Sequence, residues 1–343
     1  MTCTNQNSNT VPVMVFGVDV AKRHLDIAGH GQSPVKRFAN DSQGIAELIT
    51  WLQQFDVGMV ATEATGGLEL PLLISLYEAG YSIARLNPRW LKDFARAQGR
   101  RAKTDALDAR LIAQYVHVMH PQAWQPLDED GWTFKDLAAR RRQLIAMRTM
   151  ERNRAQACHS AYLARQHQRL IEALQTQIKE IETVLAKLIE KRDDFRNKAD
   201  IICSVPGVAQ TTAVTLIADL PELGQLNAKQ IAALVGVAPY NNESGLHNGQ
   251  RRIFGGRANV RRSLYMVAVG ITSSTNQHFK SHYLKLVQAG KPKKVAMVAV
   301  MRKLIVTLNA MIATNTAWRT PKTHRQTTQS LPDYQRFGLI SEL

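Results

Sequence analysis

Residues 13–20 read VMVFGVDV, a run of apolar and β-branched residues whose length and composition predict a buried strand. Two more short apolar segments, residues 25–28 and 35–38, follow with glycine and proline between them. Short strands separated by such residues are typical of an antiparallel meander. The stretch therefore predicts three sequential strands at the start of the chain, with Asp19 near the end of the first strand.

Strand and helix patterns then alternate as far as residue 119. Apolar residues recur at helical spacing after Ser42, a residue type that favours the N-cap position. The resulting order βββαβαβα indicates an α/β layer with a mixed sheet. The segments predicted after the meander are helices over 43–54, 68–79, 88–97 and 105–119, and strands over 57–62 and 81–86.

The middle of the chain, residues 136–192, contains almost no helix-breaking residue. Within it, apolar residues are spaced alternately three and four apart, which is the a/d spacing of a coiled coil. The repeat lasts for fewer than three heptads, so it fits two arrangements equally well: a coiled coil between chains, or an antiparallel helical hairpin within one chain. The spaced residues are Ile171, Leu174, Ile178, Ile181, Leu185 and Leu188.

Residues 201–220 read IICSVPGVAQTTAVTLIADL, two helical stretches around the turn Pro206-Gly207-Val208. This matches a helix-hairpin-helix, in which a glycine turn presents backbone N–H groups to a phosphate. An ordinary turn between two helices is the alternative. Further helices are predicted over 228–234, 259–272 and 294–313, so this part of the chain is expected to be mainly α-helical.

Four regions follow from these patterns. The first is an α/β domain over residues 11–136, and the second is a helical coiled-coil region over 137–198. A mainly α-helical domain occupies 199–315. Residues 316–343 are polar and contain proline, so we expect a flexible tail there.

The charge of the chain is uneven. The 44 Lys and Arg residues exceed the 28 Asp and Glu residues, which gives a formal net charge of +16. Residues 1–136 have a net charge of −2, whereas residues 201–343 have a net charge of +12. A basic chain of this kind favours an anionic partner, most often nucleic acid, and the asymmetry suggests separate parts for chemistry and for polyanion binding.

Several protein classes are excluded by composition. Only three cysteines are present, far apart and without a C-x-x-C pair, so a zinc ribbon or a disulfide framework is not expected. The first ten residues have no signal-peptide pattern, and we expect a protein of the reducing cytoplasm. The longest apolar stretch, residues 295–314, is interrupted by Arg302 and Lys303, so no membrane span is expected.

Four carboxylates stand at positions that matter for chemistry. Asp19 lies near the end of the first predicted strand and Glu63 directly after the strand over 57–62, while Asp105 and Asp108 share one face of a predicted helix. If the two strands are neighbours, the helix can place its acids across Asp19 and Glu63. Clustered carboxylates require cations, and hard oxygen ligands select Mg²⁺ or Mn²⁺. Two such ions are the usual apparatus for displacement at phosphorus. Taken singly, each acid also fits a local role as a turn or cap residue.

Short motifs recur in a fixed order along most of the chain. In the first half they are GVDVAK (17–22), TEATG (62–66), NP (87–88) and KTDALDAR (103–110). In the second half they are VPGV (205–208), GVAP (236–239), ESG (243–245), RRSLYM (261–266) and MRKL (301–304). Together these motifs, over roughly residues 13–310, resemble the DEDD transposases, a family of insertion-sequence recombinases that also includes the pilin-gene DNA invertases. The front domain of that family resembles the resolvase RuvC, which has an RNase H-like fold.

The resemblance implies roles for particular residues. Asp19, Glu63, Asp105 and Asp108 would form the metal-binding tetrad, and Ser244 would be the nucleophile of a covalent phosphoserine step. The residues alone do not single out Ser244, because a serine in such a polar stretch is usually structural. The resemblance also implies a site assembled from two protomers, in a dimer or a dimer of dimers, and a structured non-coding bridge RNA that pairs with donor and target DNA.

Basic residues cluster around these positions. Such clusters bind phosphates and position a nucleic-acid backbone without reading its sequence. The alternative is that the charges form only a solvated protein surface. The candidates for nucleic-acid binding are Arg100, Arg101 and Lys103 before the predicted helix over 105–119, Gly207 in the hairpin turn, Arg251, Arg252, Arg257, Arg261 and Arg262 after Ser244, and Lys293 and Lys294.

The sequence therefore supports one leading function and several alternatives. The leading one is a recombinase that cuts and rejoins double-stranded DNA as the transposase of an insertion sequence. A site-specific invertase would use the same chemistry. A RuvC-like nuclease that hydrolyses DNA with two metal ions would need the tetrad but not Ser244. A nucleic-acid-binding protein with an inactive front domain would need neither.

Overall fold

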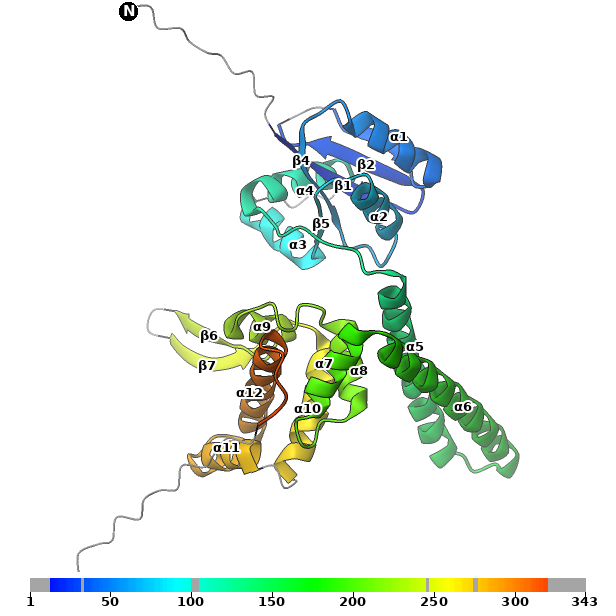
Figure 1. The fold of residues 1–343 in the computed structure, drawn as a ribbon, viewed down its shortest axis with the longest axis vertical. Coiled ribbons are helices and arrows are strands. Elements are labelled where there is room, and N and C mark those ends of the chain that lie inside the picture. Colours follow the sequence, from blue (N-terminus) through cyan, green and yellow to red (C-terminus); the bar gives the residue numbers. More distant parts are fainter. Residues whose placement is uncertain (1–12, 32–33, 100–104, 245–246, 274–276, 320–343) are drawn as a thin grey trace, which may run out of the picture. The chain divides into compact units, whose positions relative to one another are not determined.

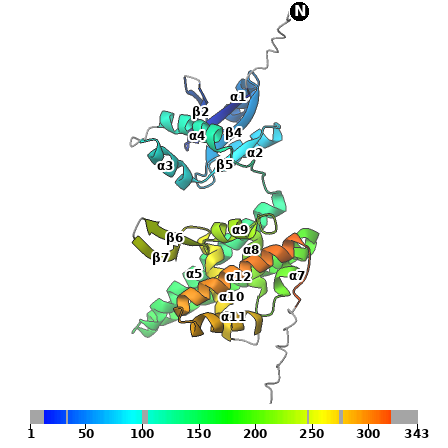
Figure 2. The same cartoon turned by 90° about the vertical axis from the view of Figure 1, so that its left-hand side faces the viewer.

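The computed structural model describes residues 13–31, 34–99, 105–244, 247–273 and 277–319. The chain divides into two compact units, residues 1–128 and 129–343 (Figures 1 and 2). The helical region expected over 137–198 is part of the second unit.

The first unit is built on a five-stranded mixed sheet with the order β3-β2-β1-β4-β5. The first three strands form the antiparallel meander, while β4 runs parallel to β1 and β5 parallel to β4. This confirms the mixed α/β architecture and makes the first and fourth strands direct neighbours. The strands are β1 (Met14–Val20), β2 (His24–Gly29), β3 (Lys36–Ala39), β4 (Val57–Glu63) and β5 (Ile83–Leu86).

Helices cover both faces of this sheet, and the alternation of side chains along β1 shows how. Phe16 and Val18 point into one core together with apolar residues of α1 (Ser42–Leu52) and α2 (Leu70–Glu78). Val15 faces the opposite core, which α3 (Pro88–Ala97) and α4 (Asp105–Met119) complete. Each β1 residue with an odd number therefore lies on the α4 face, and this includes Asp19.

One prediction about α1 is wrong in detail. Ser42 was expected to cap the helix, but it is the first helical residue, and Asp41 is the N-cap. The Asp41 side chain accepts a 2.8 Å hydrogen bond from the backbone N–H of Gly44. Asp and Ser are equally good caps, so the sequence pattern could not decide between the neighbours.

Gly17 allows α4 to approach β1 closely. A Cβ atom at this position would overlap the backbone of Ala109 and Ala113 and would lie 2.7 Å from Cβ of Ile112. The helix backbone therefore lies directly on the strand, and this contact fixes α4 over the middle of the sheet.

Gly17→Ala is expected to destabilise the first unit by about 1–3 kcal/mol, because the added methyl group meets backbone atoms that cannot rotate away. Urea unfolding of the full chain, followed by circular dichroism, measures this change. Gly270→Ala is the control, since a Cβ there meets nothing within 4 Å in an exposed helical position. The control is expected to be neutral or slightly stabilising. Equal stability of Gly17→Ala and the native chain would contradict the close packing.

The second unit begins with a helical hairpin. Helices α5 (Glu129–Gln156) and α6 (Ala161–Lys191) pack side by side, joined by four residues. Leu144 of α5 packs with Leu174 and Ile178 of α6, and Arg141 forms an ion pair with Glu182. The apolar positions spaced three and four apart thus face α5 of the same chain, which is the hairpin alternative for that spacing.

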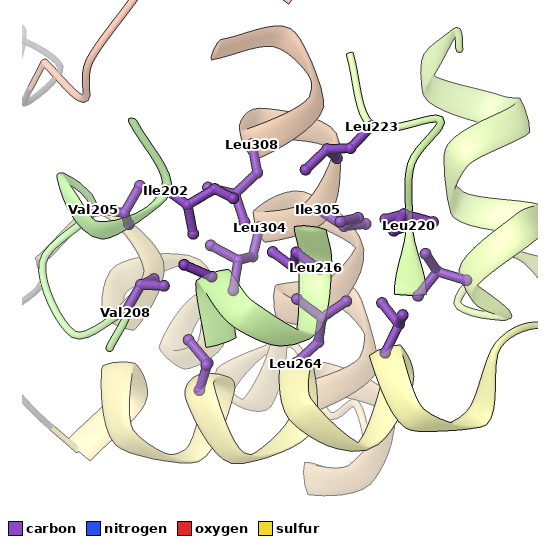
Figure 3. Close-up of a cluster of buried hydrophobic side chains, with 14 of the residues drawn as sticks. Ile202, Val205, Val208, Leu216, Leu220, Leu223, Leu264, Leu304, Ile305 and Leu308 are labelled. Carbon is purple, nitrogen blue, oxygen red and sulfur yellow. The ribbon is translucent and has the colours of Figure 1, made fainter. Parts of the chain in front are cut away.

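Further helices of the second unit surround one apolar core (Figure 3). Ile202, Leu216, Leu264 and Leu304 meet there from four different helices. The segment over 277–288, which the sequence pattern did not predict, is helical as well. The helices are α7 (Asp193–Cys203), α8 (Gln210–Asp219), α9 (Ala228–Val235), α10 (Ala258–Ser273), α11 (Gln277–Gln288) and α12 (Lys293–Ala313).

Helix α12 is the one helix, among the residues described, that is long and apolar enough to cross a membrane. Val300, Leu304 and Leu308 of this helix are fully buried in the core of the second unit. Its apolar character is therefore accounted for by packing inside the protein.

The segment after α12 is attached to the second unit. The backbone N–H of Trp318 donates a 2.8 Å hydrogen bond to Oγ of Ser204, and the Trp318 ring stacks on Phe279. A flexible tail was expected over 316–343. Within that segment Trp318 packs on the helices, and residues 320–343 lie outside the described part of the chain.

Candidate functional site

Two of the four predicted carboxylates lie side by side at one edge of the sheet. The register pairs Val18 of β1 with Thr62 of β4, so the next positions along these parallel strands are Asp19 and Glu63. Paired positions of neighbouring parallel strands place their side chains on the same face. Asp19 and Glu63 therefore share the α4 face, and both are half-buried.

The direction of α4 brings the other two carboxylates to the same edge. Ala109 and Ala113 lie over Gly17, and the ring of His117 stacks on His30 beside the start of β1, with ring centroids 3.9 Å apart. Helix α4 therefore runs antiparallel to β1, and its first turn lies at the carboxyl end of that strand.

A distance estimate supports the meeting of these residues. From the contact at Gly17, two strand residues advance about 6.6 Å to Asp19. The part of α4 that lies over Gly17 is centred near residue 111. From there, three helical residues advance about 4.5 Å toward Asp108, in the same direction as the strand. Asp108 is half-buried, and Asp105 is the first residue of the helix. The side chain of Asp105 lies outside the described part of the structure.

The donor set at this edge consists of carboxylate oxygens, which fits the preference of Mg²⁺ and Mn²⁺. The N-terminus of α4 adds the positive end of a helix dipole, which also stabilises negative charge there. Within the described residues, no group of three or more His, Cys, Asp or Glu side chains is arranged to hold a metal ion. The structure therefore shows a common edge for the tetrad positions and does not show a formed metal site.

Ser244 lies at the tip of a β-ribbon that the sequence pattern did not predict. Strand β6 (Pro239–Ser244) pairs antiparallel with β7 (His247–Ile253), and Ser244 is the register partner of His247. Figures 1 and 2 show this ribbon at the edge of the second unit, beyond its helices. The side chain of Ser244 lies outside the described residues, so only its place on the backbone is established.

Several of the predicted basic residues are exposed to solvent. Arg251 and Arg252 are exposed on β7, and Tyr240, which is 48% exposed, is the register partner of Arg252. Exposed positions are also found for Arg262 on α10 and for Lys293 and Lys294 at the start of α12. Arg100, Arg101 and Lys103 lie outside the described residues.

Two arginines of the predicted cluster hold the protein itself together. Arg257 forms an ion pair with Glu222 and donates a 2.8 Å hydrogen bond to the carbonyl oxygen of Asp219. Arg261 donates a hydrogen bond to the carbonyl oxygen of Gly255. These contacts give both guanidinium groups a structural role next to the ribbon.

Gly207 occupies the turn between α7 and α8. Its φ angle of +92° is in the left-handed region that favours glycine, and a Cβ atom would lie 2.9 Å from Cγ1 of Ile271. Glycine is therefore required both by the turn and by the packing of α10. The residue is exposed on its other side, as a phosphate-binding turn requires.

Comparison with known proteins identifies the family. Residues 16–162 match a family model of DEDD-type transposases, and residues 199–284 match the model of the transposase IS116/IS110/IS902 family. The chain belongs to this transposase family. Pilin gene-inverting proteins of Moraxella bovis and Moraxella lacunata are each 27% identical to it over 309 residues, which is 88% of this chain and 96% of each relative. The protein is accordingly a DNA transposase or recombinase enzyme.

The matched segments of this transposase contain every predicted catalytic position. The first match includes Asp19, Glu63, Asp105 and Asp108, and the second includes Ser244. The predicted resemblance to DEDD transposases is therefore confirmed, while the individual roles of these residues stay predictions.

One acidic residue of the transposase escaped the sequence analysis. Asp26 of β2 is the register partner of Asp19, so it lies on the same face, and it is only 2% exposed. Arg37 donates two hydrogen bonds to it, of 2.7 and 2.8 Å. The hydrogen bonds from Arg37 hold the pKa of Asp26 below its ordinary value. The available signal was an acid in the middle of a predicted strand, where a lone charge needs a partner.

Proposed function

We propose that this transposase cuts and rejoins DNA strands of an insertion sequence through a covalent phosphoserine at Ser244, with metal ions bound by Asp19, Glu63, Asp105 and Asp108. The observation that carries the proposal is the convergence at one sheet edge. Asp19 is the last residue but one of β1, Glu63 is the last residue of the parallel neighbour β4, and the close contact at Gly17 brings the first turn of α4 to the same edge. The sheet order supports an RNase H-like, RuvC-like identity for the first unit.

The four carboxylates would hold two Mg²⁺ or Mn²⁺ ions. When bound, such ions stabilise the negative charge that develops at phosphorus and on the oxygens around it. The chain contributes the arrangement of ligands: two from strand ends fixed by backbone pairing, and two from a helix that packs rigidly on β1.

The ribbon explains how a serine can be presented to DNA. Ser244 ends β6, and only two residues separate it from its strand partner His247, so it stands at the closed end of an antiparallel hairpin. A two-stranded ribbon fits the dimensions of a DNA groove. Backbone pairing along β6 and β7 holds the ribbon in shape as far as Ser244.

Double-stranded DNA, donor and target, is the proposed substrate. We further propose a structured bridge RNA as guide, and a dimer or dimer of dimers as the working assembly in the cytoplasm. The exposed basic residues near the ribbon and at α12 support a nucleic-acid partner, and they fit RNA or DNA equally. The α5–α6 hairpin is a candidate for contact between chains.

The decisive experiment is a search for a covalent intermediate. The protein is incubated with DNA carrying the ends of its element and with Mg²⁺, then denatured and separated by electrophoresis. A labelled DNA–protein adduct and rejoined strands are expected. Cut DNA without any adduct would favour the two-metal nuclease, and binding without cutting would favour an inactive nucleic-acid-binding protein. Transposition and inversion are then distinguished by the arrangement of the rejoined strands.

Replacing Arg251 and Arg252 together with alanine is expected to weaken nucleic-acid binding and to make the negative slope of log affinity against log salt shallower by about 2, because each phosphate contact contributes about 0.9 to its magnitude. Titration of labelled DNA at several salt concentrations measures the slope. The control replaces Lys179 and Lys187, two exposed cations of α6, with alanine. An unchanged slope in the arginine variant would mean that Arg251 and Arg252 form only a solvated surface.

A further inference from the structure

The loop that follows Glu63 has an unusual backbone. It connects β4 to α2, and both Gly66 (φ +77°) and Gly67 (φ +113°) adopt positive φ angles. Two consecutive residues of this kind reverse the chain within a short distance, and they also give it many alternative conformations in the absence of a restraint. The restraint here is a single side chain, that of Glu69.

The carboxylate of Glu69 is fully buried and fully bonded. Its Oε2 atom accepts hydrogen bonds from the backbone N–H of Thr65 (3.1 Å), from Oγ1 of Thr65 (2.9 Å) and from the backbone N–H of Gly67 (2.9 Å). Its Oε1 atom accepts from Nε and Nη2 of Arg85, at 2.8 and 2.5 Å. One carboxylate therefore ties both ends of the glycine turn to a guanidinium group.

Arg85 connects this arrangement to the sheet. It lies on β5 as the register partner of Thr62, so its side chain is on the face opposite to that of Glu63. On the same strand, Leu86 accepts a 3.0 Å hydrogen bond from the backbone N–H of Ala64, which extends the ladder one residue past β4. The backbone on both sides of Glu63 is therefore paired with β5. The turn that follows is bonded, through Glu69, to Arg85 on the opposite face of the sheet.

The arrangement needs an ionised carboxylate. Burial alone would raise the pKa of Glu69, but the hydrogen bonds from the backbone, Arg85, Gly67 and Thr65 outweigh burial and hold that pKa below its ordinary value. A neutral carboxyl or amide group at this position has fewer acceptor sites and brings a hydrogen atom against the surrounding donors. The five donors would then not all be satisfied, and the turn would lose its restraint.

We propose that Glu69, together with Arg85, is a positioning residue that fixes the 64–67 turn and thereby the direction of the Glu63 carboxylate in the metal-binding tetrad. The inference rests on the proposed metal site and adds to it the residues that keep one ligand in place. Groups hydrogen-bonded to a metal ligand typically change metal affinity by about 10- to 100-fold when they are replaced, and we take this range for Glu69, which acts on Glu63 through the backbone of the turn.

The test measures metal binding in the absence of DNA, so it does not depend on turnover. Mn²⁺ binding to the full chain is followed by calorimetry and by electron paramagnetic resonance, and thermal unfolding reports folding. Glu69→Gln is expected to weaken Mn²⁺ binding by about 10- to 100-fold. Thr65→Val removes one of the five hydrogen bonds and leaves the Arg85 ion pair intact, so a shift of only a few-fold is expected.

A matched control separates positioning from general loss of stability. Glu151 in the second unit is also a buried carboxylate, bonded to His167 and paired with Arg154. Glu151→Gln is expected to lower thermal stability without changing Mn²⁺ affinity. A folded Glu69→Gln protein with native Mn²⁺ affinity would overturn the proposal, as would native affinity in Thr65→Val if Glu69→Gln does not fold.

Mn²⁺ binding by the native chain tests the metal site separately from the positioning role of Glu69. If the native protein binds Mn²⁺ and Asp19→Asn removes that binding, the metal site stands, and only the Glu69 result decides the positioning role. If the native protein binds no Mn²⁺, the metal site itself fails, and the positioning role fails with it.

Discussion

Ser244→Ala is expected to abolish the covalent protein–DNA adduct and the rejoining of strands, while DNA affinity stays within about twofold of the native value. In the proposed step, the Ser244 hydroxyl loses its proton as Oγ bonds to the scissile phosphorus, the bond from phosphorus to one strand oxygen breaks, and that oxygen takes up one proton, so that no proton is gained or lost overall. The phosphodiester energy is kept in the phosphoserine, so a strand hydroxyl can later displace the serine and restore the DNA backbone. Removing one hydroxyl removes the whole sequence of steps and changes no charge that holds DNA.

The measurement is the same denaturing electrophoresis, combined with a binding titration. Ser273→Ala is the matched control, because Ser273 is an exposed serine of the same unit whose hydroxyl bonds only to the helix carbonyl of Val269 among the contacts seen. The control is expected to form the adduct at the native rate. Cleavage by Ser244→Ala at the native rate would remove the serine step and leave the two-metal nuclease as the better description.

The first unit could be predicted closely from the sequence, for a physical reason. Strands β1 and β4 have an apolar core on each face, so residues 13–20 and 57–62 are almost continuously apolar and are bounded by polar or glycine-containing turns. The spacing of apolar residues likewise fixed the helices over 88–97 and 105–119. Asp19 lies next to the end of one predicted strand and Glu63 directly follows the other, so the sequence predicted their meeting on the condition that the two strands are neighbours, which the sheet order fulfils.

The ribbon that carries Ser244 could not be predicted in this way. Residues 239–244 read PYNNES and residues 247–253 read HNGQRRI, with no alternation of apolar and polar residues. Such alternation arises when one face of a ribbon is buried, and Tyr240, Arg251 and Arg252 are all exposed. The pairing is held by backbone hydrogen bonds, which leave no trace in composition.

The different roles of the arginines over residues 251–262 could not be predicted from their charge. Residues 251–262 contain five arginines, and from the sequence all five were equal candidates for nucleic-acid binding. In the structure, Arg257 reaches Glu222, which is 35 residues away in sequence, and Arg261 reaches a carbonyl group of the adjoining turn. Only the folded chain shows that Arg257 and Arg261 bind other parts of the second unit, so alanine scanning for nucleic-acid binding is best directed at the exposed Arg251, Arg252 and Arg262.

Glu63→Gln and Asp19→Asn are each expected to lower Mg²⁺-dependent DNA cleavage by at least about 10³-fold, which corresponds to about 4 kcal/mol of transition-state stabilisation. Each change keeps the size of the side chain but removes a negative ligand. Because neither substitution changes the volume of the side chain, both variants are expected to stay folded, with a thermal stability close to that of the native chain.

This combination of lost activity and kept stability distinguishes ligand removal from damage to the fold. Cleavage rates on pre-cut and intact DNA, with thermal unfolding of the same samples, measure both quantities. Asp56→Asn is the control, since Asp56 is an exposed carboxylate next to the start of β4, at the opposite end of the strand from Glu63. Cleavage within tenfold of native in Glu63→Gln would mean that the first unit is not the catalytic one. In that case the convergence of acids at this edge would serve the packing of α4, and the chemistry would have to be carried by the ribbon and its surroundings alone.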